Sequence, residues 1–133
     1  MTFMKWRKDG GPESTVEGFF LIEIKSLFSI VLLKFSDGSR DAFHSHAFNC
    51  FSWVLRGKML EYHRDWTVPN RLPKGSRLIP FTTLRTTFHK VVSRNVSWVL
   101  TFRGPWSKSW EEYLPESDES HVLTDGRVVS EVI

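Results

Sequence analysis

The sequence is poor in cysteine and has no long apolar run, and each absence excludes a class of protein. Cys50 is the single cysteine among 133 residues, so the chain cannot be a disulfide-stapled domain. The most apolar stretch, residues 19–35, is interrupted by charged side chains, whereas a membrane-spanning helix needs about 20 consecutive apolar residues. With no recognisable signal peptide at its start, the sequence predicts a cytoplasmic protein without membrane attachment.

Clustered basic charge is also missing. The formal net charge is +3, but the basic residues are scattered and the acidic ones concentrate in residues 111–125. A nucleic-acid groove needs lysine and arginine gathered on one surface. We therefore expect nucleic acid not to be the partner.

Helical patterns and internal repeats are absent, and what remains is typical of strands. The chain has 11 Phe and 6 Trp, and aromatic and β-branched residues favour sheets over helices. Short segments of these residues recur between turn signals, at intervals of about ten residues. The sequence therefore predicts an all-β sandwich or barrel in a single domain.

The chain divides into three predicted segments. Residues 1–17 are expected to form an arm or edge strand, residues 18–114 the barrel, and residues 115–133 an acidic linker with a last edge strand. Edge strands at both ends of the chain also suggest a homodimer.

Within the predicted barrel, local signals indicate three further features. Gly57 lies in a predicted tight reversal at residues 55–59, and residues 93–95 are predicted to form a hairpin turn. One short helical turn is expected at residues 109–114.

Two histidines at a spacing of two residues are the first candidates for chemistry. A turn signal at Asp37 and Gly38 precedes them. Because side chains alternate along a strand, His44 and His46 would share a face and lie close enough to hold one metal ion. Glu61 and His63 have the same spacing on the next predicted strand.

This arrangement resembles the cupin superfamily of small jelly-roll barrels. Gly38, the His44 and His46 pair and Gly57 resemble the first cupin motif, and His89 resembles the histidine of the second. A longer pattern is similar to small cupin-like proteins of phages and prophages, which implies the cytoplasm of a bacterial host and a host protein as one partner. That pattern consists of His44, His46, Phe48, Ser52, Leu55, Arg56, Gly57, Glu61, His89, Lys90, Val91, Trp98, Leu100, Gly104, Pro105 and Trp110.

The resemblance implies a divalent metal held by His44, His46 and His89. Fe(II) is expected first, with Zn and Ni as alternatives. The glutamate of the cupin ligand set is missing, and counting in steps of two from His44 along a regular strand reaches Cys50. Three-histidine sites of this kind resemble those of thiol dioxygenases. Cys50 and Glu61 are therefore the candidate catalytic residues, and Glu61 and His63 are also reserve ligands.

Each of these residues has an ordinary structural alternative. Two histidines at this spacing also occur as a polar lining, and a buried cysteine often packs as a small apolar side chain. Arg85 and Arg103, with His63, are candidates for binding an anionic ligand because a guanidinium pairs with carboxylate or phosphate. Their alternative is a place at solvated strand ends.

Three functions follow as hypotheses. The first is a mononuclear non-haem iron enzyme, dioxygenase-like, that acts on a small molecule. The second is a non-catalytic protein that captures a small anionic ligand, such as a nucleotide, or blocks a host protein. The third is a metal-free sugar-nucleotide isomerase that uses one histidine as general base.

Overall fold

The computed structural model describes residues 1–9, 16–36, 43–44, 48–63, 69–73, 75–85, 88–107, 109–114, 119–124 and 128–132. These residues form eleven strands, and none of them belongs to a helix that is long and apolar enough to cross a membrane. The strands are β1 (Thr2–Lys8), β2 (Val16–Ile24), β3 (Phe28–Phe35), β4 (Phe43–His44), β5 (Cys50–His63), β6 (Asn70–Leu72), β7 (Phe81–Thr83), β8 (His89–Arg103), β9 (Ser109–Leu114), β10 (Glu119–Thr124) and β11 (Val128–Val132).

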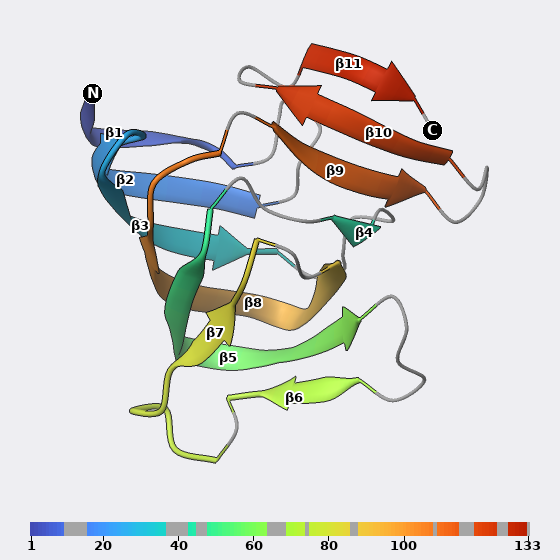
Figure 1. Cartoon of the computed structure of the whole chain (residues 1–133). Helices are drawn as coiled ribbons and strands as arrows, with labels where there is room; N and C mark the ends of the chain where they lie inside the picture. The colour runs from blue at the N-terminus through green and yellow to red at the C-terminus, as the bar shows by residue number, and fades with distance from the viewer. Residues whose placement is uncertain are drawn as a thin grey trace.

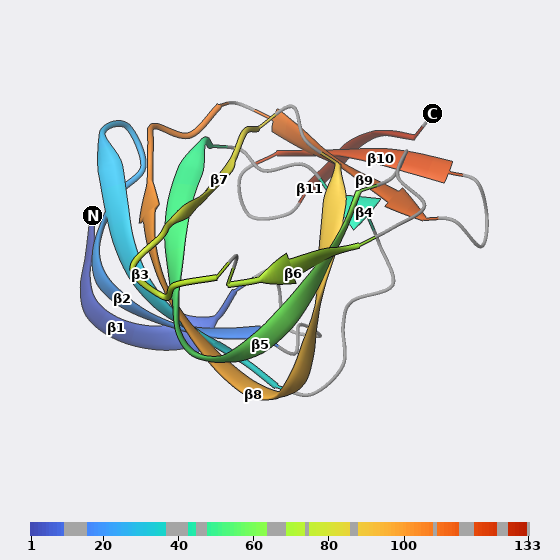
Figure 2. The same cartoon turned by 90° about the horizontal axis from the view of Figure 1, so that it is seen from below.

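One antiparallel sheet connects all of these strands. Its order is β1-β2-β3-β8-β4-β9-β10-β11, and β5 adds a branch by pairing with β6, β7 and β8. The sheet is strongly curved (Figures 1 and 2), and its described strands leave two ends at β1 and β11 rather than closing into a barrel. The prediction of an all-β jelly-roll class is confirmed.

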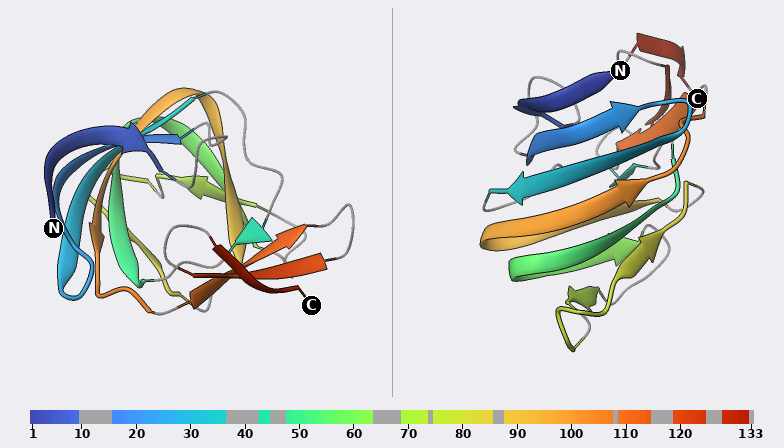
Figure 3. Two further views of the ribbon diagram at one scale, coloured as in Figure 1. Left: turned by 90° about the horizontal axis from the view of Figure 1, so that it is seen from above. Right: turned by 90° about the vertical axis from the view of Figure 1, so that its left-hand side faces the viewer.

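Strand β8 is the centre of the sheet, because it has neighbours on both sides at each of its two ends. Its first residue pairs with β4 and β5, whereas its second half pairs with β3 and β5. Figure 3 shows the order β1, β2, β3, β8 and β5 in its right-hand view. The two ends of β8 therefore lie in different surroundings, and each end brings together side chains from separate parts of the sequence.

Three local predictions were wrong. The chain does not reverse at residues 55–59 or 93–95, because β5 and β8 each run through these positions as one long strand. The turn signals mark bends instead. Gly57 has φ 96° and Asn95 has φ 63°, and the register between the two strands shifts on both sides of Arg56. Residues 109–114, where a helical turn was expected, form strand β9.

The bend depends on a close approach between β5 and β8. A Cβ atom at Gly57 would lie 2.8 Å from the Cα of Ser97, closer than real Cβ atoms approach. The hydroxyl oxygens of Ser93 and Ser97 lie 2.7 Å apart, and the Ser93 hydroxyl donates to the carbonyl of Asn95 at 2.7 Å. These contacts satisfy buried polar groups where the regular ladder is interrupted.

The apolar core lies in the middle of the curved sheet. Side chains alternate along each strand, so one face of β2, β3, β5 and β8 supplies the core. Phe20 and Val31 have no exposed surface, and Val54 and Val99 have 1% each. Leu33, Met59 and Leu72 complete the cluster. Towards either end of β8 the same inner face becomes polar. One of these polar regions surrounds His89, and the other surrounds Arg103.

Candidate functional site

A buried carboxylate joins two histidines at the start of β8. Glu61, on β5, is 5% exposed. One of its oxygens lies 2.8 Å from Nδ1 of His89, and the other lies 3.0 Å from Nε2 of His63. Alternation along β5 puts Glu61 and His63 on one face, and the register places His63 opposite His89. Three residues from two strands thus form one hydrogen-bonded group.

The charge on Glu61 fixes the protons of both rings. Burial on its own would raise the pKa of Glu61, but the hydrogen bond and charge of His89, followed by those of His63, outweigh it and lower the pKa to about 2. An ionised carboxylate only accepts hydrogen bonds. His89 must therefore carry a proton on Nδ1 and His63 on Nε2. In neutral His89, the basic nitrogen is then Nε2.

The group runs from the interior towards solvent. His89 is 3% exposed, whereas 19% of the His63 side chain is accessible. Glu61 lies between the two rings and contacts both. The Glu61 carboxylate therefore stabilises a positive charge on the buried His89 ring. His63, on the other side of Glu61, is the member of the group nearer to solvent.

The predicted metal ligands are only partly described by the structure. His44 lies opposite His89 in the pairing of β4 with β8, so the backbone brings two of the three histidines together. His46 lies outside the described residues. Among the side chains that the structure does describe, no three His, Cys, Asp or Glu residues form a group that could hold a metal ion. The three-histidine site therefore stays a prediction.

The position of Cys50 corrects the count that placed it beside the histidines. His44 ends β4 and Cys50 begins β5, with a bend at Phe48 between them, so no single regular strand joins the two. Cys50 pairs in register with Thr83 and Arg103. Burial raises the pKa of the thiol although Arg103 acts to lower it. Cys50 packs with Phe48, as expected of a small apolar side chain.

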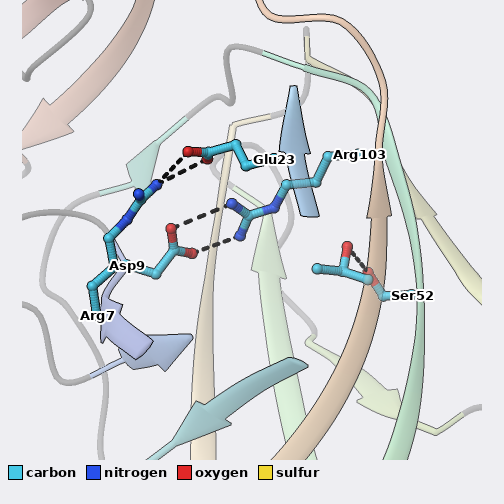
Figure 4. Close-up of polar contacts among 6 residues, drawn as sticks. Arg7, Asp9, Glu23, Ser52 and Arg103 are labelled. Atoms are coloured by element: carbon cyan, nitrogen blue, oxygen red, sulfur yellow. Dashed lines mark hydrogen bonds and ion pairs between the residues drawn. The ribbon is translucent and has the colours of Figure 1, made fainter. Parts of the chain in front are cut away.

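The three candidate ligand-binding residues do not form one group. His63 lies with His89 at one end of the β5 and β8 pair, whereas Arg103 lies at the other end. Arg103 is 5% exposed and donates to Asp9 at 2.7 Å, as Figure 4 shows. Arg85 is exposed, and its backbone N–H donates to the side chain of Asn49 at 2.8 Å.

Sequence reasoning missed two ion pairs near Arg103, one between Arg103 and Asp9 and one between Arg7 and Glu23. Asp9 belongs to the segment that we expected to be an arm, and nothing local marks it as the residue that faces a buried arginine. Glu23 carried a usable signal, since a charge inside the apolar strand at residues 19–24 needs a partner if it is buried. Arg7 supplies that partner with two hydrogen bonds of 2.7 and 2.9 Å.

Comparison with known proteins finds similarity in structure and none in sequence. No protein-family model matches the chain, and no curated protein matches its sequence. A sugar phosphate isomerase of the cupin superfamily from Silicibacter pomeroyi DSS-3 is similar with a TM-score of 0.64 and 13% identity, over 93% of this chain and 85% of that one.

Two further solved structures have the same fold. The polyketide cyclase RemF from Streptomyces resistomycificus has a TM-score of 0.61 and 18% identity, over 76% of this chain and 73% of its own. An RmlC-like cupin from Shewanella frigidimarina NCIMB 400 has a TM-score of 0.55 and 18% identity, over 74% and 81%. At such identities the likeness shows the fold alone. The antiparallel order around β8, together with these likenesses, shows that the chain has a jelly-roll fold like that of these cupin structures.

Proposed function

We propose that the protein is an enzyme that moves a proton on a small, oxygen-rich molecule, with His89 as the general base. The observation that carries this proposal is the buried Glu61 carboxylate, which lies 2.8 Å from Nδ1 of His89 and 3.0 Å from Nε2 of His63. A carboxylate behind an imidazole orients the ring, fixes its tautomer and stabilises the cation that forms when the ring takes a proton.

Each residue has a defined part in this reaction. Nε2 of His89 removes the proton, and the ionised Glu61 stabilises the resulting imidazolium. His63 is the more accessible member of the group and exchanges protons with solvent. A carbon-bound proton next to a carbonyl group is a suitable target, because the charge left on the substrate spreads onto the carbonyl oxygen.

Two structural neighbours support this class of reaction by analogy. One is a sugar phosphate isomerase and the other a polyketide cyclase. Interconverting sugar phosphates requires moving protons next to a carbonyl or hydroxyl carbon. Since the likeness covers the fold alone, the roles proposed for His89, Glu61 and His63 are supported by the geometry of this chain and not by its neighbours.

Proton exchange with deuterated solvent tests the proposal without knowledge of the product. The protein is incubated with a panel of sugar phosphates in D₂O, and loss of carbon-bound protons is followed by ¹H NMR. We expect exchange in at least one substrate, reduced about 100-fold or more in His89→Asn and Glu61→Gln, since general-base catalysis contributes 10²–10⁴-fold. Lys5→Gln, at an exposed position on β1, is the matched control. Equal exchange in the wild type and His89→Asn would contradict the proposal.

A metal-dependent function is the second candidate, and it is favoured by the register of His44 opposite His89. A histidine that binds a metal commonly donates its other N–H to a carboxylate, as His89 does to Glu61. In this function His44, His46 and His89 would hold the ion. Fe(II), or else Zn or Ni, would supply Lewis-acid chemistry and, for iron, dioxygen chemistry. Glu61 would then orient His89.

Metal analysis of protein prepared without a histidine tag separates the two functions. Stoichiometric iron, zinc or nickel that is lost in the His44→Ala and His46→Ala double variant would support the second. Metal-free protein that keeps full proton exchange would exclude it and leave the first intact.

A further inference from the structure

A second row of buried side chains, polar except for Cys50, crosses the inner face of the sheet at the opposite end of β8. Five residues from five strands follow one another in register: Glu23 on β2, Ser29 on β3, Arg103 on β8, Cys50 on β5 and Thr83 on β7. All five are at most 7% exposed. Burying polar groups costs free energy unless each finds a partner, so such a row needs an explanation. We call it the Arg103 row.

Two polar atoms of the Arg103 row have no hydrogen-bond partner among the residues that the structure describes. They are the hydroxyl oxygen of Ser29 and Nε of Arg103, and their residues are direct register partners on β3 and β8. The neighbouring pair Ser52 and Thr101 is satisfied internally, with its hydroxyl oxygens 2.9 Å apart. Nε–H only donates, and the serine hydroxyl is able to donate as well, so an acceptor oxygen is the group that would satisfy both atoms.

The charges around Arg103 cancel in two pairs. Arg103 donates to Asp9 at 2.7 and 3.4 Å, and Arg7 donates to Glu23 at 2.7 and 2.9 Å (Figure 4). An added anion would give three negative charges against two positive ones, so one carboxylate has to leave. Asp9 is the one able to do so, because 29% of its side chain is accessible, against 3% for Glu23.

Aromatic rings hold the Arg103 guanidinium independently of Asp9. Its central carbon lies 4.7 Å from the ring centre of Phe48 and 5.7 Å from that of Phe20. The side chain is 4% exposed, which leaves it little freedom to follow Asp9 outwards. A guanidinium fixed in this way remains ready for another anionic partner once Asp9 departs.

We propose that the Arg103 row binds the carboxylate or phosphate group of a small molecule, which accepts hydrogen bonds from Arg103 and Ser29 and replaces Asp9. Asp9 is thus an internal competitor that pairs with the guanidinium until such a molecule binds. This site is independent of the reaction assigned to His89, because the two groups lie at opposite ends of the β5 and β8 pair.

Inorganic phosphate and the Asp9→Asn variant provide the test. Thermal unfolding is measured over a phosphate series at constant ionic strength, balanced with potassium chloride. We expect phosphate to raise the melting temperature of the wild type in a saturable manner, because a ligand of the folded state stabilises it. Asp9→Asn should be less stable without phosphate and bind it about tenfold more tightly, corresponding to roughly 1.4 kcal/mol of relieved competition.

Two further variants keep the test decisive. Glu17→Gln removes a carboxylate that pairs with Lys34 at 3.9 Å on the neighbouring strands, and its phosphate response should equal that of the wild type. Ser29→Ala removes an unsatisfied hydroxyl, so it should fold normally and bind phosphate several-fold more weakly. If Asp9→Asn fails to fold, the phosphate response of Ser29→Ala tests the proposal in its place.

Three results would overturn the proposal. If phosphate stabilises neither the wild type nor Asp9→Asn beyond chloride, the Arg103 row is not an anion-binding site. If Asp9→Asn weakens phosphate binding, Asp9 is no competitor. If Ser29→Ala leaves the phosphate response unchanged, binding occurs elsewhere. Proton exchange at His89 is measured on the same proteins, so failure of one site is distinguishable from failure of the other.

Discussion

The carboxyl group of Glu61 couples the stability of this protein to acid. Its pKa is about 2 in the folded protein against an ordinary value of 4.5. A lowered folded pKa means that the folded state holds the proton less tightly than the unfolded chain does. The carboxylate therefore stabilises the fold above pH 4.5, and this contribution is lost as the pH falls towards 2.

Glu61→Gln should remove this acid dependence. The shift from 4.5 to about 2 corresponds to a loss on the order of 3 kcal/mol in the wild type, because each pKa unit is worth about 1.4 kcal/mol. Urea unfolding at a series of pH values measures it. Glu17→Gln, which changes a more exposed carboxylate, should keep the wild-type slope. A variant at position 61 with the same slope as the wild type would show that other carboxylates cause the loss.

Two features require glycine at position 57. Its φ angle is positive, and Ser97 lies too close to leave room for a Cβ atom. Gly57→Ala should cost about 3 kcal/mol or more, because strain at positive φ adds to a collision with Ser97. Gly75→Ala is the matched control, since Gly75 has φ 84° but no atom within 4 Å of the added Cβ. We expect it to cost about 1 kcal/mol, from strain alone. Equal losses in chemical denaturation would mean that the contact with Ser97 contributes nothing.

At the scale of elements, the long strands β5 and β8 decide the architecture. Each bends in its middle while its pairing continues, so one strand pair contributes to both polar ends of the interior. Gly57 and Asn95 have positive φ angles, but the local signals at these positions predicted reversals of the chain. They could not show that pairing resumes beyond them, because that depends on the partner strand.

The two buried serines at the bend should act as one unit. Ser93→Ala and Ser97→Ala should each cost about 1 kcal/mol, as expected for a buried hydrogen bond. Because their hydroxyl oxygens lie 2.7 Å apart, the double variant should cost less than the sum by about 0.5 kcal/mol or more. A double-mutant cycle in urea measures the coupling. Strict additivity would show that the bend does not depend on this contact.

At the scale of the whole molecule, an apolar core separates two polar groups. One is centred on a buried carboxylate, Glu61, and the other on a buried guanidinium, Arg103. The Glu61 group and the Arg103 row share β5 and β8 but lie at opposite ends of the pair, with Val54 and Val99 among the core residues. The expected homodimer stays a prediction. Strands β1 and β11, the two ends of the described sheet order, are the candidates for pairing.

The two polar groups should contribute independently to stability. Residues that share no partner usually give additive effects, to within about 0.5 kcal/mol. We therefore expect the loss in the Asp9→Asn and Glu61→Gln double variant to equal the sum of the single losses at neutral pH, measured by urea unfolding. A clear deviation would show that the core transmits strain between the two ends.

The sequence alone determined the class of the fold and one face of the candidate site. Aromatic and β-branched composition predicted strands because those side chains suit a pleated surface. Alternation put Glu61 and His63 on one side of a strand, since a period of two is a local property of the backbone. The resemblance of the His44 and His89 region to cupins was likewise visible in local spacing.

Tertiary structure decided which of these side chains meet. The register between β5 and β8 pairs His63 with His89 and Cys50 with Arg103, and it follows from bends whose effect depends on both strands together. Asp9 reaches Arg103 across 94 positions of sequence, a contact that no local pattern contains. Partners across a sheet are fixed by strand pairing and shared burial, and those exist only once the chain has folded.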